Sequence, residues 1–366
     1  MDRVLVESVG SFLRDRELLH QRYHMAKGEI QYDDMRKIED YFIEDIVGKQ
    51  KQHGLKIITD GELRRSWWHL DFFLGFEGIE KTYPEEGYIF YDEETRAESI
   101  GVIGKIKATE HPIIKDYEFM KKFEDDEYKV KITIPSPTMM FYEIKREQGI
   151  ESYKKIYLYD KDLEEDIISA YIKVINDLYD KGLRYIQLDD TSWAKFMDNN
   201  YLNDMINNEE DPQKLLETNV YLINSVIKKI PKDMNVSIHV CRGNYHSTYF
   251  ANGGYDKVSD YLFKRLDVDK YYLEFDDERS GPIDVIKDIP KDKEIVLGIV
   301  TTKNGKLEDK DKLEAKIKKA LEYVDKDRLK ISPQCGFAST EEGNIITEEQ
   351  QWDKIELLND LSYLLK

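Results

Sequence analysis

Short apolar runs rich in β-branched residues alternate with longer amphipathic stretches along the chain. A short, nearly continuous apolar run is typical of a parallel strand that is covered on both faces. We count eight such runs, at residues 3–8, 55–60, 128–134, 184–189, 234–240, 270–275, 294–300 and 329–334. The pattern therefore predicts eight parallel strands.

The stretches between these runs carry apolar side chains at the spacing of helices that cover a sheet. The clearest are residues 32–54, 163–182, 212–230, 310–324 and 348–365. Alternating strands and helices imply right-handed crossovers, and eight such units close most economically into an α/β fold of the (β/α)8 TIM barrel type. A doubly wound open sheet is the alternative. Its dinucleotide-binding version is disfavoured because no GxGxxG motif follows the first run.

One connection, residues 77–127, is too long for an ordinary loop. It contains a turn-like PEEG sequence at 84–87 and an apolar stretch, SIGVIGKIKA, at 99–108. We predict an inserted β-hairpin and a short helix between the second and third strands, which stabilise a lid or contribute a specific binding surface. No internal repeat or Ser/Gly linker is visible, so residues 1–366 are predicted to form a single barrel domain.

The composition narrows the class of partner. The 366 residues include 55 Lys and Arg against 74 Asp and Glu, a net charge of −19, which argues against a nucleic-acid surface. A hydrophobic share of 40% can fill a large core, and no stretch approaches the roughly 18 apolar residues of a membrane span. Two cysteines and a start without a signal-peptide pattern predict a reducing, cytoplasmic location. The expected ligand is a small molecule, and the sequence predicts no oligomeric state.

Candidate metal ligands stand at the ends of later runs. His239 and Cys241 are two residues apart on one strand, so their side chains project to the same side. Glu274 and Cys335 end two further runs, and all strand C-termini of a barrel open onto one face. A single histidine or cysteine in such a position is usually a packing residue, but both cysteines of the chain occur there. The set predicts zinc, and ligands spread over several strands favour a catalytic site over a structural one.

The chain also resembles the C-terminal catalytic barrel of cobalamin-independent methionine synthase, in a short single-barrel form. The resemblance runs through the chain in order, about one motif per strand, in VGSF (9–12), TDGELRR (59–65), IPSPTMM (134–140), IQLDD (186–190), HVC (239–241), LEFDD (273–277) and SPQCGF (332–337). It implies a (β/α)8 barrel whose zinc is bound by His239, Cys241, Glu274 and Cys335. It further implies methyl transfer to the thiol of homocysteine from a donor such as 5-methyltetrahydrofolate with a polyglutamate tail.

The resemblance also implies a binding site for homocysteine. Val9 and Ser11 would lie near its carboxylate, while Glu62 and Asp189 would hold its ammonium group by charge-assisted hydrogen bonds. Other roles remain open for these residues: Ser11 could cap a helix. Glu62 and Asp189 could belong to structural ion pairs.

Three departures from that family leave the reaction open. The chain has no room for the second, N-terminal barrel of the full-length enzymes, so the methyl donor is not predicted beyond a folate or a simpler compound. Lys303 stands where the family has a histidine, and we predict that it acts with Asp189 in catalysis. Trp67 and Trp68 replace a more polar run and either bind a substrate or pack.

Two other functions fit the same metal ligands. One is thiol alkylation of the type catalysed by epoxyalkane:coenzyme M transferase. Two carboxylates at Glu62 and Asp189 argue against it, because they would repel the sulfonate of coenzyme M. The other is a zinc-binding barrel without catalytic turnover.

Overall fold

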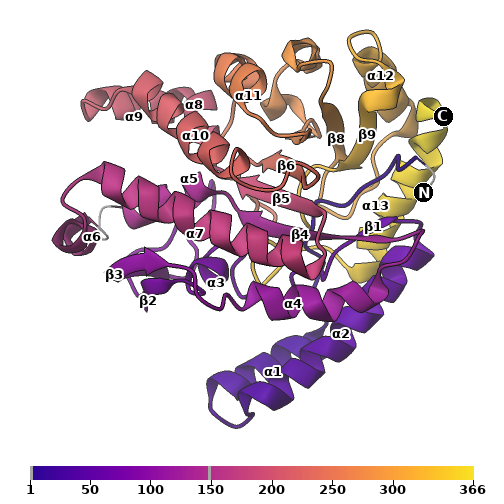
Figure 1. Ribbon diagram of the computed structural model, residues 1–366. Helices are drawn as coiled ribbons and strands as arrows, with labels where there is room; N and C mark the ends of the chain where they lie inside the picture. The colour runs from indigo at the N-terminus through magenta and orange to yellow at the C-terminus, as the bar shows by residue number, and fades with distance from the viewer. Residues whose placement is uncertain (1–2, 147–149) are drawn as a thin grey trace.

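The computed structural model describes residues 3–146 and 150–366 and is built around a curled sheet of parallel strands (Figure 1). Neighbouring strands are parallel throughout, in the order β1-β4-β5-β6-β7-β8-β9. These strands are β1 (Ile57–Ile58), β4 (Lys129–Pro135), β5 (Tyr185–Asp190), β6 (Asn235–Val240), β7 (Lys270–Glu274), β8 (Glu294–Val300) and β9 (Leu329–Pro333). The prediction of a (β/α)8-type barrel is confirmed, and each of these strands overlaps one predicted run.

The N-terminal segment completes the ring between β9 and β1. Val6 forms a parallel bridge with Ile331, and the Glu7 amide donates to the Ile331 carbonyl at 3.0 Å. Farther along, the Phe12 amide donates to the carbonyl of Gly61, just after β1. The predicted first strand is therefore reduced to a single bridge. The physical reason is that side chains from inside the barrel bind the carbonyls of Ser8 and Val9, which a regular strand would use for pairing.

Helices surround the sheet and connect its strands (Figure 1). The α-helices outside the insertion are α1 (Arg16–Ala26), α2 (Tyr32–Gln52), α3 (Leu70–Phe73), α5 (Pro137–Ile144), α6 (Ile150–Ile156), α7 (Asp160–Lys181), α8 (Ala194–Met197), α9 (Asn199–Asn207), α10 (Pro212–Ile227), α11 (Ser259–Arg265), α12 (Lys310–Ala320) and α13 (Glu348–Leu361). Short 3-10 helices are η1 (Lys121–Phe123), η2 (Tyr255–Lys257), η3 (Glu278–Ser280), η4 (Ile283–Asp288), η5 (Lys326–Arg328) and η6 (Ser362–Leu365). Among the described residues, no helix is both long and apolar enough to cross a bilayer.

Local signals account for the ends of the predicted helices. Helix α10 begins with Asp211, whose carboxylate accepts from the amide of Gln213, followed by Pro212 in the first turn. Helix α7 ends at Gly182, which adopts the left-handed conformation at φ 117°. Helix α13 starts with a capping box formed by Thr347 and Gln350.

The inserted segment forms the predicted hairpin and short helix. Strands β2 (Glu77–Thr82) and β3 (Ser99–Lys107) are antiparallel, and α4 (Ile113–Met120) follows them. The hairpin lies beside α6 and α7 on one side of the barrel (Figure 1). His111 ties the insertion to α3, because its Nε2 donates to the Phe72 carbonyl at 2.9 Å and its Nδ1 accepts from the Ile113 amide.

The buried His111 makes stability depend on pH. Burial lowers its pKa from 6.5 to about 4, so between these values only the unfolded chain binds the proton and stability falls as the pH is lowered. The variant His111→Gln has no titrating group at this position. When the pH falls from 7 to 4, its free energy of unfolding should decrease by up to about 3 kcal/mol less than that of the wild type, at about 1.4 kcal/mol per pH unit. Urea unfolding across that range measures the difference. His20→Gln, at an exposed position of α1, is the control, and parallel curves for wild type and His111→Gln would contradict the prediction.

Candidate active site

A cavity of about 540 Å³ opens at the C-terminal ends of the strands. Most of the residues selected from the sequence line it: Val9, Ser11, Glu62, Trp67, Trp68, Asp189, His239, Cys241 and Cys335. Glu274 and Lys303 lie outside the lining. The barrel thus brings residues from the start, middle and end of the chain to one place.

The four predicted metal ligands meet at the inner side of this cavity. Their ligand atoms all lie within 4.8 Å of one another, and all four residues are buried. The two sulfur atoms, of Cys241 and Cys335, are 3.5 Å apart. A Cβ on Gly298 of β8 would lie 2.5 Å from the Cα of Gln334, so a glycine allows the chain before Cys335 to pass this close to β8.

The donor set fits a divalent metal ion. Both ring nitrogens of His239 and Oε1 of Glu274 are buried without a hydrogen-bond partner. The neighbouring Cys335 and burial both raise the pKa of the Cys241 thiol, so the cluster is electrostatically unfavourable in its ionised form without a cation. A His, Glu and two Cys arranged around one point match the ligand preference of zinc.

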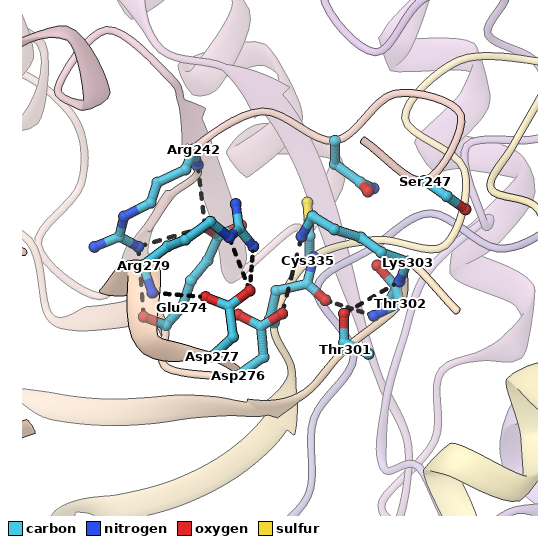
Figure 2. A network of polar contacts seen from close by, with 12 residues as sticks. Arg242, Ser247, Glu274, Asp276, Asp277, Arg279, Thr301, Thr302, Lys303 and Cys335 are labelled. Carbon is cyan, nitrogen blue, oxygen red and sulfur yellow. Dashed lines mark hydrogen bonds and ion pairs between the residues drawn. The ribbon is translucent and has the colours of Figure 1, made fainter. Parts of the chain in front are cut away.

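Residues beside the ligands hold Glu274 in place (Figure 2). Its Oε2 accepts from the backbone amide of Arg242 at 3.2 Å and lies 3.4 Å from the Arg242 Nη1. The guanidinium stacks on the ring of Tyr255, whose hydroxyl accepts from the Glu274 amide. Orienting contacts of this kind tune a metal ligand. Sequence reasoning missed both residues, although Arg242 directly follows the HVC motif.

Two buried carboxylates lie beside the metal ligands. Asp189 stands directly opposite His239 in the register of β5 and β6. Burial and the charge of Glu62 raise the pKa of Asp189 to about 7, while Thr133 Oγ1 donates to Glu62 at 2.7 Å. Glu62 also forms a buried ion pair with Arg65 at 3.6 Å, while Asp189 accepts a hydrogen bond from the neutral side chain of Gln187. Such a pair of carboxylates suits a cationic ligand group, whose charge offsets their repulsion.

The backbone at Glu62 is in the left-handed region, at φ 58°. Arg14 stabilises this turn, because its Nη2 donates to the carbonyls of Glu62 and Arg65, each at 2.8 Å. Its Nη1 donates to the carbonyls of Ala338 and Thr340 in the loop after β9. A strained residue held by surrounding contacts is a common feature of functional sites.

Val9 and Ser11 line the cavity from the N-terminal segment. The Ser11 hydroxyl accepts from the Ala338 amide at 3.2 Å, and a Cβ on Gly336 would collide with that hydroxyl. The alternative that Ser11 caps a helix is wrong, because Asp15 is the N-cap of α1. The Val9 carbonyl accepts from the side chain of Gln187.

The two tryptophans lie on the side of the insertion. Trp67 is buried, and its Nε1 donates to Glu98 of the insertion at 2.7 Å. Trp68 is half-buried and packs on the imidazole of His69 at 4.6 Å between ring centres. Most of the Trp67 side chain is therefore used in packing, although the rings of both tryptophans also line the cavity.

Lys303 follows β8 and lies outside the lining of the cavity. Its Nζ is 3.9 Å from Oδ2 of Asp276, and Figure 2 shows the two side chains pointing toward each other. The Lys303 ammonium and both Asp276 oxygens are buried without a hydrogen-bond partner. Asp276 was not selected from the sequence, although it belongs to the LEFDD motif.

The outer cavity contains residues that the sequence did not single out. The insertion contributes Tyr88 and Phe90, and other elements contribute Lys195, Tyr201 and Phe250. The insertion also contacts the loop after β6, because the Tyr91 amide donates to the Tyr249 carbonyl and Glu93 pairs with His246 at 2.8 Å. No sequence pattern marks these rings as neighbours, since the contacts join distant loops.

Comparisons with known proteins agree with this geometry. A family model described as the catalytic domain of cobalamin-independent synthase matches residues 5–351. The protein YxjH of Bacillus subtilis (strain 168) is 42% identical over 357 residues, which cover 97% of this chain and 93% of that protein. A methionine synthase of Saccharolobus solfataricus is 24% identical over 332 residues, 90% of this chain and 86% of that protein.

A solved structure agrees as well. A Listeria monocytogenes protein described as a vitamin-B12 independent methionine synthase has a TM-score of 0.75 and 35% identity, over 98% of this chain and 96% of that one. The match of the family model to nearly the whole chain shows that this protein belongs to the cobalamin-independent methionine synthase family, and it is therefore a methyltransferase.

Proposed function

We propose that this protein methylates the thiol of homocysteine to give methionine, with Zn²⁺ held by His239, Cys241, Glu274 and Cys335. The observation that carries the proposal is the convergence of these four ligand atoms within 4.8 Å beside a cavity that Glu62 and Asp189 also line. The relative in Saccharolobus solfataricus that is named methionine synthase supports the choice of acceptor.

Each end of homocysteine has a matching group in the cavity. A free thiol is mostly protonated at neutral pH, because its pKa is about 8.5, and zinc bound here would ionise it. Glu62 and Asp189 accept hydrogen bonds from the ammonium group, and Ser11 lies on the side proposed for the carboxylate. Binding at both ends aims the sulfur at the donor methyl group, which lowers the entropic part of the barrier.

The methyl donor is proposed to be 5-methyltetrahydrofolate, with or without a polyglutamate tail, or a simpler compound. The aromatic side chains of Tyr88, Phe90 and Phe250 in the outer cavity offer stacking surfaces for a flat ring. This chain spans 86% of the Saccharolobus methionine synthase, so a protein of that name has the length of a single barrel. Trp67 and Trp68 are proposed to close the same side of the cavity.

Lys303 is proposed to supply the proton that the leaving group of the donor takes up. Its ammonium has no hydrogen-bond partner, so its N–H groups are free to donate. Asp276, 3.9 Å away, holds the side chain back, and Lys303 must turn from it to reach the cavity. Asp189, beside the metal ligands, is proposed to act on the acceptor.

Thiol alkylation with a coenzyme M-type thiol remains the second candidate, because Lys303 departs from the family pattern. The charge of Glu62 and Asp189 disfavours it, since both would repel a sulfonate. A zinc barrel without turnover is disfavoured because His239, Cys241 and Cys335 line an open cavity instead of closed packing.

Removal of one sulfur ligand tests the metal centre. In Cys335→Ser, the poorer oxygen ligand should reduce bound zinc well below one ion per chain and lower methionine formation by at least about a hundredfold, through loss of thiol activation. Elemental analysis and an assay of methionine from homocysteine measure both, with circular dichroism to verify folding. Full turnover by a folded variant without metal would remove zinc from the mechanism.

Addition of homocysteine tests whether the metal has an exchangeable position. X-ray absorption of the zinc-loaded protein should show more sulfur around the metal after homocysteine is added, because the thiolate joins the two cysteine ligands. Coenzyme M, added in a parallel sample, should produce a smaller change. An unchanged spectrum with every thiol would favour the non-catalytic zinc barrel.

The carboxylate pair should control recognition of the ammonium group. Asp189→Asn removes one charged hydrogen bond and should raise the KM for homocysteine about 10- to 100-fold while zinc is retained. The wild type should discriminate against 4-mercaptobutyrate, which lacks the amine, and the variant should discriminate much less. Asp211→Asn, at the exposed N-cap of α10, is the matched control. Equal KM values for Asp189→Asn and the wild type would contradict the proposed role.

A further inference from the structure

A buried lysine lies directly below the substrate cavity, inside the barrel. Lys131 of β4 is fully enclosed, and its Nζ donates to Oε1 of Gln187 at 2.6 Å, to the Ser8 carbonyl at 2.7 Å and to the Tyr272 hydroxyl at 3.1 Å. An ammonium group has three N–H donors, and each has one acceptor here. Burial lowers the pKa of Lys131 to about 7, while these three acceptors and the charge of Glu7 favour its ammonium form.

This contact determines how the amide of Gln187 is oriented. An ammonium group pairs with the amide oxygen and repels the amide NH₂. Gln187 Nε2 must then face the other way, where it donates to Oδ1 of Asp189 at 2.7 Å and to the Val9 carbonyl at 2.7 Å. Both acceptors belong to residues that line the substrate cavity.

Lys131 is itself anchored from below. Tyr272 donates to Glu7, a carboxylate with no exposed surface, and Glu7 pairs with Lys270 at 2.8 Å and with Lys330 at 3.1 Å. Charged groups in the interior are costly unless paired, so the network is stable only as a connected set. It links the closed end of the barrel to Asp189.

We propose that Gln187, oriented by Lys131, is a positioning residue that holds Asp189 and the Val9 carbonyl in place for the amino-acid end of the acceptor. The inference rests on the proposed function, since it assigns the acceptor to that end of the cavity. Gln187 does not line the cavity and acts through its two hydrogen-bond acceptors. Neither Gln187 nor Lys131 was selected from the sequence as a functional residue.

Two substitutions distinguish the proposed positioning role of Gln187 from a purely structural role, in which Gln187 would only pair with Lys131. Gln187→Glu keeps an oxygen for Lys131 but has no N–H to donate to Asp189 or Val9, whereas Gln187→Met loses both functions. We expect both variants to raise the KM for homocysteine about tenfold, with kcat within about threefold of the wild type and bound zinc unchanged. Only Gln187→Met should lower the melting temperature strongly, because it removes one of the three acceptors of the buried Lys131 ammonium.

Lys330→Met is the matched control, since it disturbs the same network at the Glu7 end. It should lower the melting temperature and leave the KM for homocysteine unchanged. A wild-type KM in Gln187→Glu would overturn the inference. If Gln187→Glu does not fold, Lys131→Met takes its place, and it should raise the KM because the freed amide can turn away from Asp189.

A failure of the proposed function can be distinguished from a failure of this inference. If the wild-type protein binds no homocysteine, the proposed function fails, and the crystal structure of Gln187→Glu then decides the inference. We expect the Asp189 carboxylate to rotate away from its wild-type position, because the like charge of Glu at 187 repels it. An Asp189 that keeps its position would overturn the inference.

Discussion

The structure depends on how charge is balanced in a buried cluster of four ionisable side chains. His239, Cys241, Glu274 and Cys335 come from the ends of the three strands β6, β7 and β9, and their ligand atoms lie within 4.8 Å of one another. Unpartnered nitrogen and oxygen atoms in this cluster would be costly without a cation. The parallel barrel makes the arrangement feasible because all strand C-termini meet at one face.

Below that face, the barrel interior is unusually polar. Lys131, Glu7 and Lys270 occupy positions where apolar side chains would pack, and they are stable only through mutual hydrogen bonds. The same network binds the carbonyls of Ser8 and Val9, which keeps the N-terminal segment from forming a regular strand. The same hydrogen bonds therefore affect both the closure of the barrel and the positions of residues that line the cavity.

The outer cavity is built from loops instead of strands. The insertion between β1 and β4 supplies aromatic side chains and meets the loop after β6 through Tyr91 and Glu93. Such loops vary more readily than the strands beneath them, so specificity for the proposed methyl donor is expected to reside there, while the barrel sets the proposed acceptor site.

The sequence by itself determined the parallel barrel, the inserted hairpin and which residues could bind a metal, because each follows from a local pattern. Apolar runs mark strands, helical spacing marks their covering helices, and the alternation of His239 and Cys241 places both on one side. Only the tertiary structure decided that Arg242 supports Glu274, that Lys303 faces Asp276, and that Gln187 is oriented by Lys131. Such contacts depend on register between strands and on burial depth, which bring together residues far apart in the chain and leave no periodic signal in it.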